Sequence, residues 1–369
     1  MEPMTSLPIG ANGAAVDDAV PLSAYTTLRL GGPAARFVAA DTADDVAAAV
    51  RTADARRERV LVLGGGSNLV IADEGFDGTV VRVGNRGSKI DYLGDGRVAL
   101  TVEAGEDWDA IVCQTVDAGL GGLECLSGIP GSVGATPVQN VGAYGIEVAQ
   151  LLISVDLLDR GAGEVRTLGV DDLGLGYRTS VLKGTERAVV LRVRFELTDG
   201  GESAPIRYTE LARVLGVRQG RRVPVAVARE AVLDLRRGKG MVLDPTDNDT
   251  WSVGSFFTNP VVPDSELPAV LGQIAERVGP DLPVPQYPAG AGTSKLSAAW
   301  LIERAGFRRG HAGPGGRVTL SGKHTLALTN RGAASTADLL ALAREIRDGV
   351  RTAFGVELYP EPVLVDCAI

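Results

Sequence analysis

The stretch LGGGSN, residues 63–68, contains residue types that can bind a phosphate group. Three glycines follow the apolar run VLVL, namely Gly64, Gly65 and Gly66. Because glycine has no Cβ, successive backbone N–H groups can converge on a diphosphate, and Ser67 and Asn68 add side-chain donors. The stretch lacks the third glycine of a GxGxxG turn and the GK[ST] ending of a P-loop. It therefore predicts a phosphate-binding turn of neither common kind.

A second glycine-rich stretch, GGLECLSGIPGSVGATPVQNVGAYG, spans residues 121–145. It has seven glycines and a single charged residue, Glu124. A solvated linker of this length would be rich in charged side chains, so we expect the stretch to be buried. Its irregular backbone then needs hydrogen-bond partners, which a dinucleotide can supply. The alternative is a glycine-rich connection that packs only on its own protein.

The scarcity of histidine and the cysteine spacing exclude other chemistries. His311 and His324 are the two histidines, which excludes a zinc hydrolase built on several histidines, and a Ser-His-Asp triad would have to use one of them. The cysteines, Cys113, Cys125 and Cys367, form no CxxC pair. They predict neither a disulfide framework nor a zinc site, in agreement with a reducing compartment.

Composition and charge narrow the class of protein further. The 369 residues are 45% hydrophobic and 22% charged, which is typical of a globular chain with two or three domains. A net charge of −9 argues against a nucleic-acid or anionic-membrane partner. The N-terminal residues lack the features of a signal peptide, and no apolar run is long enough to span a bilayer. We therefore expect a cytoplasmic protein.

Alternating strands and helices must position the two glycine-rich stretches. Cap signals and apolar spacing predict helices over 41–53, 224–237, 294–305 and 335–354. Apolar runs predict strands over 60–63, 79–83, 97–103, 151–159, 188–197 and 356–366. In the strand over 188–197, apolar residues alternate with charged ones, which indicates that one face is exposed. The segment GGESAP, residues 200–205, is predicted to be a linker.

Five ordered motifs extend this reading. They are LGGGSNLV (63–70), GIPGSVGATPVQNVGAYG (128–145), GYRTS (176–180), GSFFTNP (254–260) and LYPEP (358–362). With them the sequence resembles the UDP-N-acetylenolpyruvoylglucosamine reductases, flavoenzymes of bacterial peptidoglycan synthesis. The resemblance runs from about Tyr25 to the C-terminus, in the family's order.

The resemblance implies an α+β fold with an FAD-binding domain of the vanillyl-alcohol-oxidase type and an α+β substrate-binding domain. We expect the FAD domain over 20–199, the substrate domain over 200–355, and a last strand within 356–369 that returns to the first domain. FAD is the expected occupant of the glycine-rich stretches. Its expected contacts are Gly64, Gly65, Gly66, Ser67, Asn68, Ile129, Pro130, Gly131, Ser132, Thr136, Asn140 and Gly142.

The reaction that the resemblance implies is the NADPH-dependent reduction of UDP-N-acetylglucosamine enolpyruvate, through FAD, to UDP-N-acetylmuramate. Arg178 would pair with the enolpyruvyl carboxylate and hold the charge that develops there, because guanidinium stays cationic. Ser255 would donate a proton to the neighbouring carbon, with Lys239 or Lys295 helping to activate it. Glu361, between Pro360 and Pro362, is expected to act as a neutral acid or through an intervening water. Without the resemblance, each of the three would be an ordinary surface or turn residue.

Substrate binding is expected to use a local group of cations and a tyrosine loop. The resemblance implies contacts from Tyr208, Arg236, Lys239, Asn259, Lys295 and His324. Tyr208 indicates the longer variety of the family, in which a loop closes over the diphosphate. The sequence departs from the family at Thr26, where many relatives have Asn, and at Pro362, where Val is frequent. We expect no metal, and a monomer.

Two other functions stay open. One is a flavin oxidase on the same FAD domain, although no histidine before His311 is present to tether a flavin, and Cys113 or Cys125 would have to do so. The other is a nucleotide-sugar-binding protein without turnover. Such a protein would tolerate alanine at Ser255, whereas a reductase would lose proton delivery.

Overall fold

The computed structural model describes residues 15–369, which form two compact units. Among these residues, unit 1 contains 15–21, Pro33–Gly66 and Gly75–Val242, and unit 2 contains Leu22–Gly32, Ser67–Glu74 and Leu243–Ile369. The chain therefore passes from one unit to the other several times before it reaches Gly75. Residues 1–14, which lack the sequence features of a signal peptide, lie outside the described residues.

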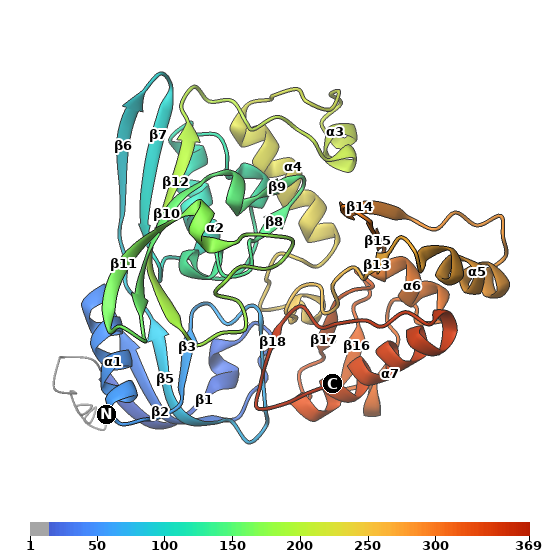
Figure 1. Cartoon of the computed structure of the whole chain (residues 1–369), viewed down its shortest axis with the longest axis horizontal. Coiled ribbons are helices and arrows are strands. Elements are labelled where there is room, and N and C mark those ends of the chain that lie inside the picture. Colours follow the sequence, from blue (N-terminus) through green and yellow to red (C-terminus); the bar gives the residue numbers. More distant parts are fainter. Residues whose placement is uncertain (1–14) are drawn as a thin grey trace. The chain divides into compact units, whose positions relative to one another are not determined.

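Two sheets form the framework of unit 1 (Figure 1). The first has the order β1-β2-β5-β3, with β1 at Ala15–Pro21, β2 at Pro33–Ala40, β3 at Val60–Leu63 and β5 at Phe76–Val83. The second has the order β11-β10-β12-β7-β6, with β6 at Ser88–Gly94, β7 at Arg97–Glu103, β10 at Leu152–Asp159, β11 at Glu164–Gly169 and β12 at Ala188–Thr198. β2, β5 and β3 run parallel, whereas all neighbours in the second sheet are antiparallel. The expected strands are thus confirmed, apart from small shifts at their ends.

Helix α1, Ala43–Ala55, packs on the first sheet and confirms the helix expected over 41–53 (Figure 1). Thr42 is its N-cap, and the Thr42 side chain accepts a hydrogen bond from the Asp45 N–H. This bond satisfies one of the N–H groups that a helix start leaves without a partner inside the helix. Val46 and Val50 are fully buried on the inner face. Burial of one face and a capped start together fix this helix.

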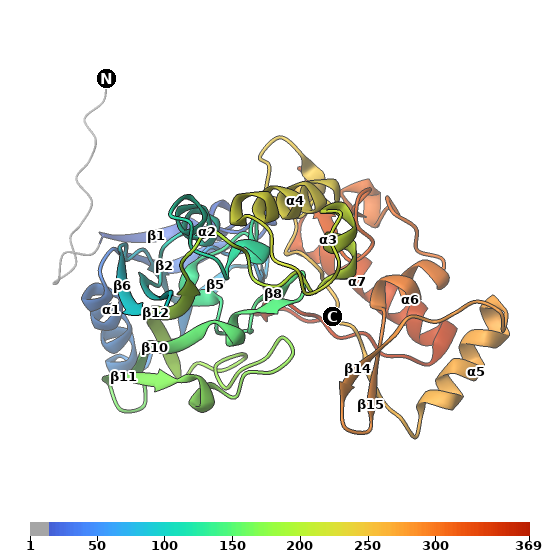
Figure 2. The ribbon, with the colours of Figure 1, turned by 90° about the horizontal axis from the view of Figure 1, so that it is seen from above.

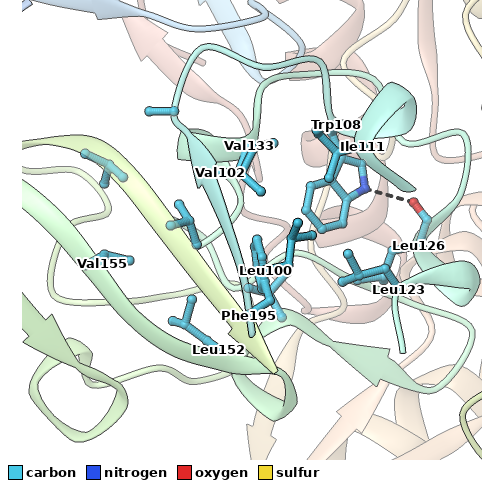
Figure 3. Packing of buried hydrophobic residues seen from close by; sticks show 14 of the residues in the cluster. Leu100, Val102, Trp108, Ile111, Leu123, Leu126, Val133, Leu152, Val155 and Phe195 are labelled. Atoms are coloured by element: carbon cyan, nitrogen blue, oxygen red, sulfur yellow. Dashed lines mark hydrogen bonds between the residues drawn. The ribbon is translucent and has the colours of Figure 1, made fainter. Parts of the chain in front are cut away.

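The core of unit 1 lies between the second sheet and helix α2, Trp108–Asp117 (Figure 3). Phe195 of β12 is fully buried and packs edge-to-face against Trp108, with ring centroids 5.8 Å apart. Arg192, Arg194 and Glu196 remain partly exposed on the opposite face of β12, which confirms the predicted alternation. The Trp108 indole N–H donates to the Leu126 carbonyl at 3.0 Å (Figure 3). The Trp108 ring is therefore packed in the core, and its N–H has a hydrogen-bond partner there.

Three elements complete unit 1. They are the short hairpin of β8, Gly142–Ala143, and β9, Ile146–Glu147; helix α3, Thr209–Val214; and helix α4, Val225–Gly238, which lies beside α3 (Figure 2). Helix α4 confirms the helix expected over 224–237. The segment expected to be a linker does not leave the unit. Ser203 is fully buried, its N–H donates to the Val223 carbonyl, and unit 1 continues to Val242.

Unit 2 has short sheets and three helices (Figure 1). Its strands are β4 at Leu69–Ile71, β13 at Val261–Pro263, β14 at Gln286–Gly290, β15 at Thr293–Leu296, β16 at Val318–Leu320, β17 at Leu328–Asn330 and β18 at Val363–Val365. Its helices are α5 at Leu267–Val278, α6 at Ala298–Arg304 and α7 at Thr336–Phe354. β18 pairs in parallel with β4, which brings the end of the chain beside a segment from its first quarter. Within the strand expected over 356–366, only Val363–Val365 is ladder-paired.

Helix α7 confirms the helix expected over 335–354, with both predicted ends. The Ser335 side chain accepts from the Asp338 N–H, the Asp338 side chain accepts from the Ser335 N–H, and Gly355 adopts the left-handed conformation at the C-terminus. The helix expected over 294–305 is wrong in its first turn. Thr293–Leu296 is strand β15, and Ser297 caps the shorter helix α6 by accepting from the Trp300 N–H. Lys295 therefore lies on a strand and does not open a helix.

Candidate functional site

The two glycine-rich stretches meet in unit 1. Gly64 and Gly65 follow β3, and a Cβ built on Gly65 would lie 2.6 Å from the Cα of Gly131. A Cβ on Gly64 would collide with the Oγ of Ser132. The backbones of two segments almost 70 residues apart can approach this closely only because the facing positions have no side chain.

The backbone at this meeting point fits a diphosphate. Among the described residues, the N–H groups of Gly65, Gly66, Gly131 and Ser132 donate to no other protein group. Gly66 and Gly131 have φ values of 60° and 133°, a region that favours glycine. Free N–H groups on closely spaced, side-chain-free backbone form a concave set of donors for an anion. The residues present therefore suit the diphosphate of FAD, and Ile129 and Pro130 lead directly into this turn.

Helix α2 anchors the second stretch from behind. The Gly131 carbonyl accepts from the Trp108 N–H at 3.0 Å, and the Gly128 N–H donates to Asp109 Oδ1 at 2.6 Å. Arg229 binds the same carboxylate through both terminal nitrogens, at 2.7 and 2.9 Å. Burial raises the pKa of Asp109, but the hydrogen bonds from Arg229 and Gly128, with the positive charges of Arg229 and Arg236, lower this pKa by more, so the net shift is downward. Asp109 is thus ionised and holds the start of residues 128–132, the GIPGS segment, through the N–H of Gly128.

Much of the 121–145 stretch packs on its own protein. Residues from Leu123 to Ser127, together with Val133, are fully buried in the core of unit 1. Glu124 accepts from the N–H groups of Gly122 and Ala204, both at 2.6 Å, and burial raises the pKa of its carboxyl. The interpretation as a self-packed connection is therefore correct for these residues. The segment from Ile129 to Gly131 and the residues around Gly142 are only partly buried.

Asn140, Gly142 and Arg178 form a second group in unit 1. The tight turn over 176–179 is closed by hydrogen bonds between Gly176 and Thr179, and Arg178 has a φ of 54° in it. The Arg178 guanidinium donates to the Gly142 carbonyl at 2.6 Å and to the Asn140 carbonyl at 3.4 Å. Asn140 is almost fully buried and donates to the Gly176 carbonyl at 2.9 Å. Three residues predicted to contact cofactor or substrate are therefore held in one network. Thr136, also predicted, is buried nearby in the chain and donates to the Val133 carbonyl.

Tyr208 and Lys239 form a third group with Tyr144. The Tyr208 ring meets the Tyr144 ring edge-to-face at 5.4 Å between centroids, and Lys239 Nζ lies 5.8 Å from the Tyr144 centroid. Lys239 Nζ also donates to Glu210 Oε2 at 2.6 Å. Burial raises the pKa of Tyr144 to about 12, so its hydroxyl stays protonated at neutral pH. The group thus brings together two aromatic rings and a cation that Glu210 pairs.

Arg236 lies in the last turn of α4 and is only partly exposed to solvent. Its Nη2 donates to the carbonyls of Gly128 and Met241, at 3.3 and 2.7 Å. Burial lowers the pKa of Arg236 to about 10, while electrostatic interactions with Tyr144 and Asp109 act in the opposite direction. The buried Nε atom of Arg236 has no hydrogen-bond partner. At neutral pH this residue is a partly buried cation beside Gly128, the first residue of the GIPGS segment.

In unit 2, Ser255 and Glu361 lie on adjacent segments. The Glu361 N–H donates to the Phe256 carbonyl at 2.9 Å, and the Thr258 N–H donates to the Tyr359 carbonyl at 3.0 Å, so the two segments run antiparallel. Phe256 and Phe257 are fully buried and pack edge-to-face. The two phenylalanine rings therefore anchor this segment in the core, and Gly254, with a φ of 76°, precedes Ser255. These anchors fix the backbone on both sides of the two predicted catalytic residues.

The other predicted residues of unit 2 divide between two places. The backbone carbonyl of Asn68 accepts from the N–H of Val363 at 2.9 Å. This contact places Ser67 and Asn68 beside the segment that contains Glu361, two residues before Val363. The turn of His324 lies beside Ser255, because the Phe256 N–H donates to the Leu326 carbonyl. Asn259 Oδ1 instead accepts from the Ala298 N–H at 2.9 Å, and Lys295 pairs with Val261 in the β13-β15 ladder.

Four residues that interact with the predicted ones were missed from the sequence. They are Asp109, Arg229, Glu147 and Glu210, all charged residues that pair with a side chain distant in the sequence. Tyr144, which contacts Tyr208 and Lys239, differs from these four because it lies in the second glycine-rich stretch, which carried a signal. A charged residue in a helix or hairpin is by default a solvated one, so sequence reasoning had no reason to select these four.

Two findings concern absences within the described residues. No group of three or more His, Cys, Asp or Glu side chains that could hold a metal ion occurs between residues 15 and 369. No helix in that part of the chain is both long and apolar enough to cross a bilayer.

Two family models match separate parts of the chain, and several known proteins are similar to it. A family model described as an FAD binding domain matches residues 34–169, and one described as UDP-N-acetylenolpyruvoylglucosamine reductase, C-terminal domain, matches 244–365. The UDP-N-acetylenolpyruvoylglucosamine reductase of Saccharopolyspora erythraea is 70% identical over 97% of this chain and 98% of its own. That of Nocardia farcinica is 57% identical over 97% and 91%. A crystal structure of the enzyme of this name from Thermus caldophilus is similar with a TM-score of 0.64 and 26% identity, covering 95% of this chain and 99% of that one.

Proposed function

Because the chain belongs to the UDP-N-acetylenolpyruvoylglucosamine reductase family, we propose that it reduces UDP-N-acetylglucosamine enolpyruvate to UDP-N-acetylmuramate with NADPH. The α+β fold with an N-terminal FAD-binding domain, and the assignment as an FAD-dependent oxidoreductase, are confirmed. The electron donor NADPH, the place in peptidoglycan precursor synthesis, the monomeric state and the cytoplasmic location are parts of the proposal.

The contact between residues 64–66 and residues 131–132 is the structural observation that supports the proposal most. It offers unpaired backbone N–H groups where the expected diphosphate of FAD needs donors. When bound, FAD supplies hydride transfer, from NADPH and then to the terminal vinyl carbon of the sugar nucleotide. All binding of charge and all movement of protons falls to side chains of the protein.

Arg178 is proposed to bind the enolpyruvyl carboxylate. Hydride addition to the vinyl carbon leaves negative charge on the adjacent carbon, and this charge spreads into the carboxylate as an enolate. A guanidinium held in place stabilises that charge more than it stabilises the substrate, which lowers the barrier. The backbone contacts of Arg178 with Asn140 and Gly142 support this role, because they orient the group before substrate arrives.

Ser255 is proposed to donate the proton that completes the reduction at the carbon bearing the ether oxygen. Glu361, on the neighbouring antiparallel segment, is proposed to act as a neutral acid near the same carboxylate. An ionised carboxylate there would repel the enolate. Tyr208, Lys239, Arg236, Asn259, Lys295 and His324 are proposed to hold the sugar nucleotide, whose diphosphate needs cations because the protein is acidic overall.

The proposed function is tested by mixing the purified protein with NADPH and following nicotinamide oxidation with and without UDP-N-acetylglucosamine enolpyruvate. We expect oxidation that depends on the sugar nucleotide and yields UDP-N-acetylmuramate in equal amount. Oxidation that ignores the sugar nucleotide and consumes oxygen would instead identify an oxidase. Tight binding of the sugar nucleotide without NADPH oxidation would identify a binding protein.

A further inference from the structure

Glu147 lies against Arg178 although no motif selects it. It is the last residue of β9 and pairs across the hairpin with Gly142 of β8. Its Oε1 lies 3.8 Å from Arg178 Nη1, and its Oε2 accepts from Asn140 Nδ2 at 3.1 Å. One carboxylate therefore contacts the proposed catalytic guanidinium and also the side-chain amide of Asn140, whose backbone carbonyl accepts from Arg178.

Gly142 makes this arrangement possible. A Cβ at position 142 would lie 2.7 Å from Glu147 Cγ and 3.1 Å from Arg178 Nη1. Any other residue would therefore displace the Glu147 side chain, the Arg178 side chain or both. The glycine that was expected to contact the cofactor is also the position across which the two charged side chains meet.

The backbone of Arg178 depends on the same hairpin. Asn140 Nδ2 donates to the carbonyl of Gly176, which begins the tight turn, and Asn140 Oδ1 accepts from the Ala149 N–H at 3.0 Å. Arg178 has a φ of 54°, a conformation that L residues adopt rarely and that surrounding contacts must hold. Through Asn140, Glu147 connects to the strained turn as well as to the guanidinium.

We propose that Glu147 is a positioning residue that acts through Arg178, fixing the direction in which the guanidinium faces the enolpyruvyl carboxylate. The proposal rests on the function proposed above for Arg178. Glu147 does not need to touch the substrate. Its negative charge by itself weakens the attraction of Arg178 for a carboxylate, so its benefit must come from orientation.

A positioning role and a purely electrostatic role of Glu147 predict opposite effects when its charge is removed. Glu147→Gln removes the charge and keeps an oxygen that can accept from Asn140. If Glu147 only reduced the positive potential, the variant would bind the substrate more tightly and turn over at least as fast. Loss of orientation instead lowers kcat, by about tenfold to a hundredfold for a displacement near 1 Å, without raising KM for the sugar nucleotide.

The test is a double-mutant cycle with E147Q, Arg178→Lys and the combined variant, each purified with its flavin content and thermal midpoint measured. E196Q is the matched control, because Glu196 lies 3.6 Å from Arg97 in an ion pair of unit 1 whose two side chains are about half exposed. We expect E147Q to lose kcat selectively, E196Q to match the wild type, and E147Q to cause no further loss once Arg178 is Lys. Unchanged flavin content and midpoint would accompany these results.

Other outcomes would overturn the proposal. If E147Q keeps the wild-type kcat, or if its loss multiplies with that of Arg178→Lys, Glu147 does not act through Arg178. Should E147Q fold poorly, E147D tests the same point, since it keeps the charge and shortens the reach by one methylene. A wild-type rate in E147D would also overturn the role. Absence of turnover by the wild type would instead overturn the proposed function, which the same assay reports first.

Discussion

Gly65 and Gly131 lie so close together that a Cβ on Gly65 would stand 2.6 Å from the Cα of Gly131 and 2.8 Å from its carbonyl carbon. This contact joins the end of β3 to the segment that helix α2 anchors through Trp108 and Asp109. Backbone atoms cannot move aside as the end of a flexible side chain can. The proposed diphosphate site therefore depends on the absence of a single carbon atom.

We predict that Gly65→Ala separates the two turns and weakens FAD binding. An overpacked contact of this kind costs about 1 to 3 kcal/mol of unfolding free energy. The variant should be purified with less flavin, measured as the ratio of flavin to protein absorbance, and should unfold at lower denaturant. Gly272→Ala is the control, because that glycine lies in α5 with open space around its Cβ position, and alanine there should raise stability slightly. Full flavin content in Gly65→Ala would contradict the proposed site.

The anchor of the second turn predicts a dependence of stability on pH. Asp109→Asn leaves Arg229, which is largely buried, without its carboxylate and should lower the free energy of unfolding by about 3 kcal/mol near pH 7. The pKa of Asp109 is lowered in the folded protein, so its contribution is present above the unfolded pKa and is lost as pH falls through the folded pKa. Urea unfolding should show a constant difference between the wild type and the variant above about pH 4, and this difference should shrink as pH falls further.

The control for this measurement is Asp234→Asn. Asp234 pairs with Arg237 at 3.0 Å, and both side chains are more than half exposed. Exposed pairs contribute about 0 to 1 kcal/mol, so this variant should resemble the wild type. An Asp109→Asn protein as stable as the control would show that the pair with Arg229 does not anchor the turn.

Lys239 must exchange Glu210 for a phosphate if it binds the sugar nucleotide. The two side chains are 2.6 Å apart and each is about one third exposed, so the pair is worth about 1 kcal/mol or less. Glu210→Gln should therefore lower KM for UDP-N-acetylglucosamine enolpyruvate about twofold to fivefold, whereas Lys239→Met should raise it. KM is measured at low and high salt, and the effect of Glu210→Gln should shrink at high salt. An unchanged KM in both variants would remove Lys239 from the binding site.

Ser255→Ala should retain FAD and substrate binding and lose turnover. A general acid in the right position contributes about a hundredfold to ten-thousandfold, so kcat should fall by that order while KM changes little. Ser294→Ala is a matched control, since Ser294 is a half-buried serine on β15 that bonds to Asp264. Comparable rates in the two variants would show that another group, or water, delivers the proton.

Local signals in the sequence were sufficient for many elements. Thr42 before α1 and the Ser335–Asp338 pair before α7 act within one helical turn, so the residue types alone predict both starts. Lys295 shows where local reasoning fails. Its segment has helical spacing, yet it lies between β13 and β14, and ladder bonds to both override the propensity of the segment. The buried Ser203 likewise follows glycines that suggested a linker, because its partner is Val223.

The candidate site was predictable where the residue types within one short motif indicate what the motif binds. Glycines 64–66 and the GIPGS segment showed from their residue types that something must approach the backbone closely. Glu147 and Asp109 were not predictable, because a carboxylate is selected as functional only by the cation that folding places beside it. Glu147 and Arg178 are far apart in the sequence, and their contact depends on Gly142, whose missing side chain leaves room for both.

The central claim is tested most directly by a single turnover without oxygen. The purified yellow protein is reduced with one equivalent of NADPH, and UDP-N-acetylglucosamine enolpyruvate is then added while flavin absorbance is followed. We predict that the absorbance is bleached by NADPH, stays bleached, and returns only when the sugar nucleotide is added, with UDP-N-acetylmuramate formed in the same amount as flavin. A colourless protein that takes up no FAD, or reduced flavin that the sugar nucleotide does not reoxidise, would contradict the account.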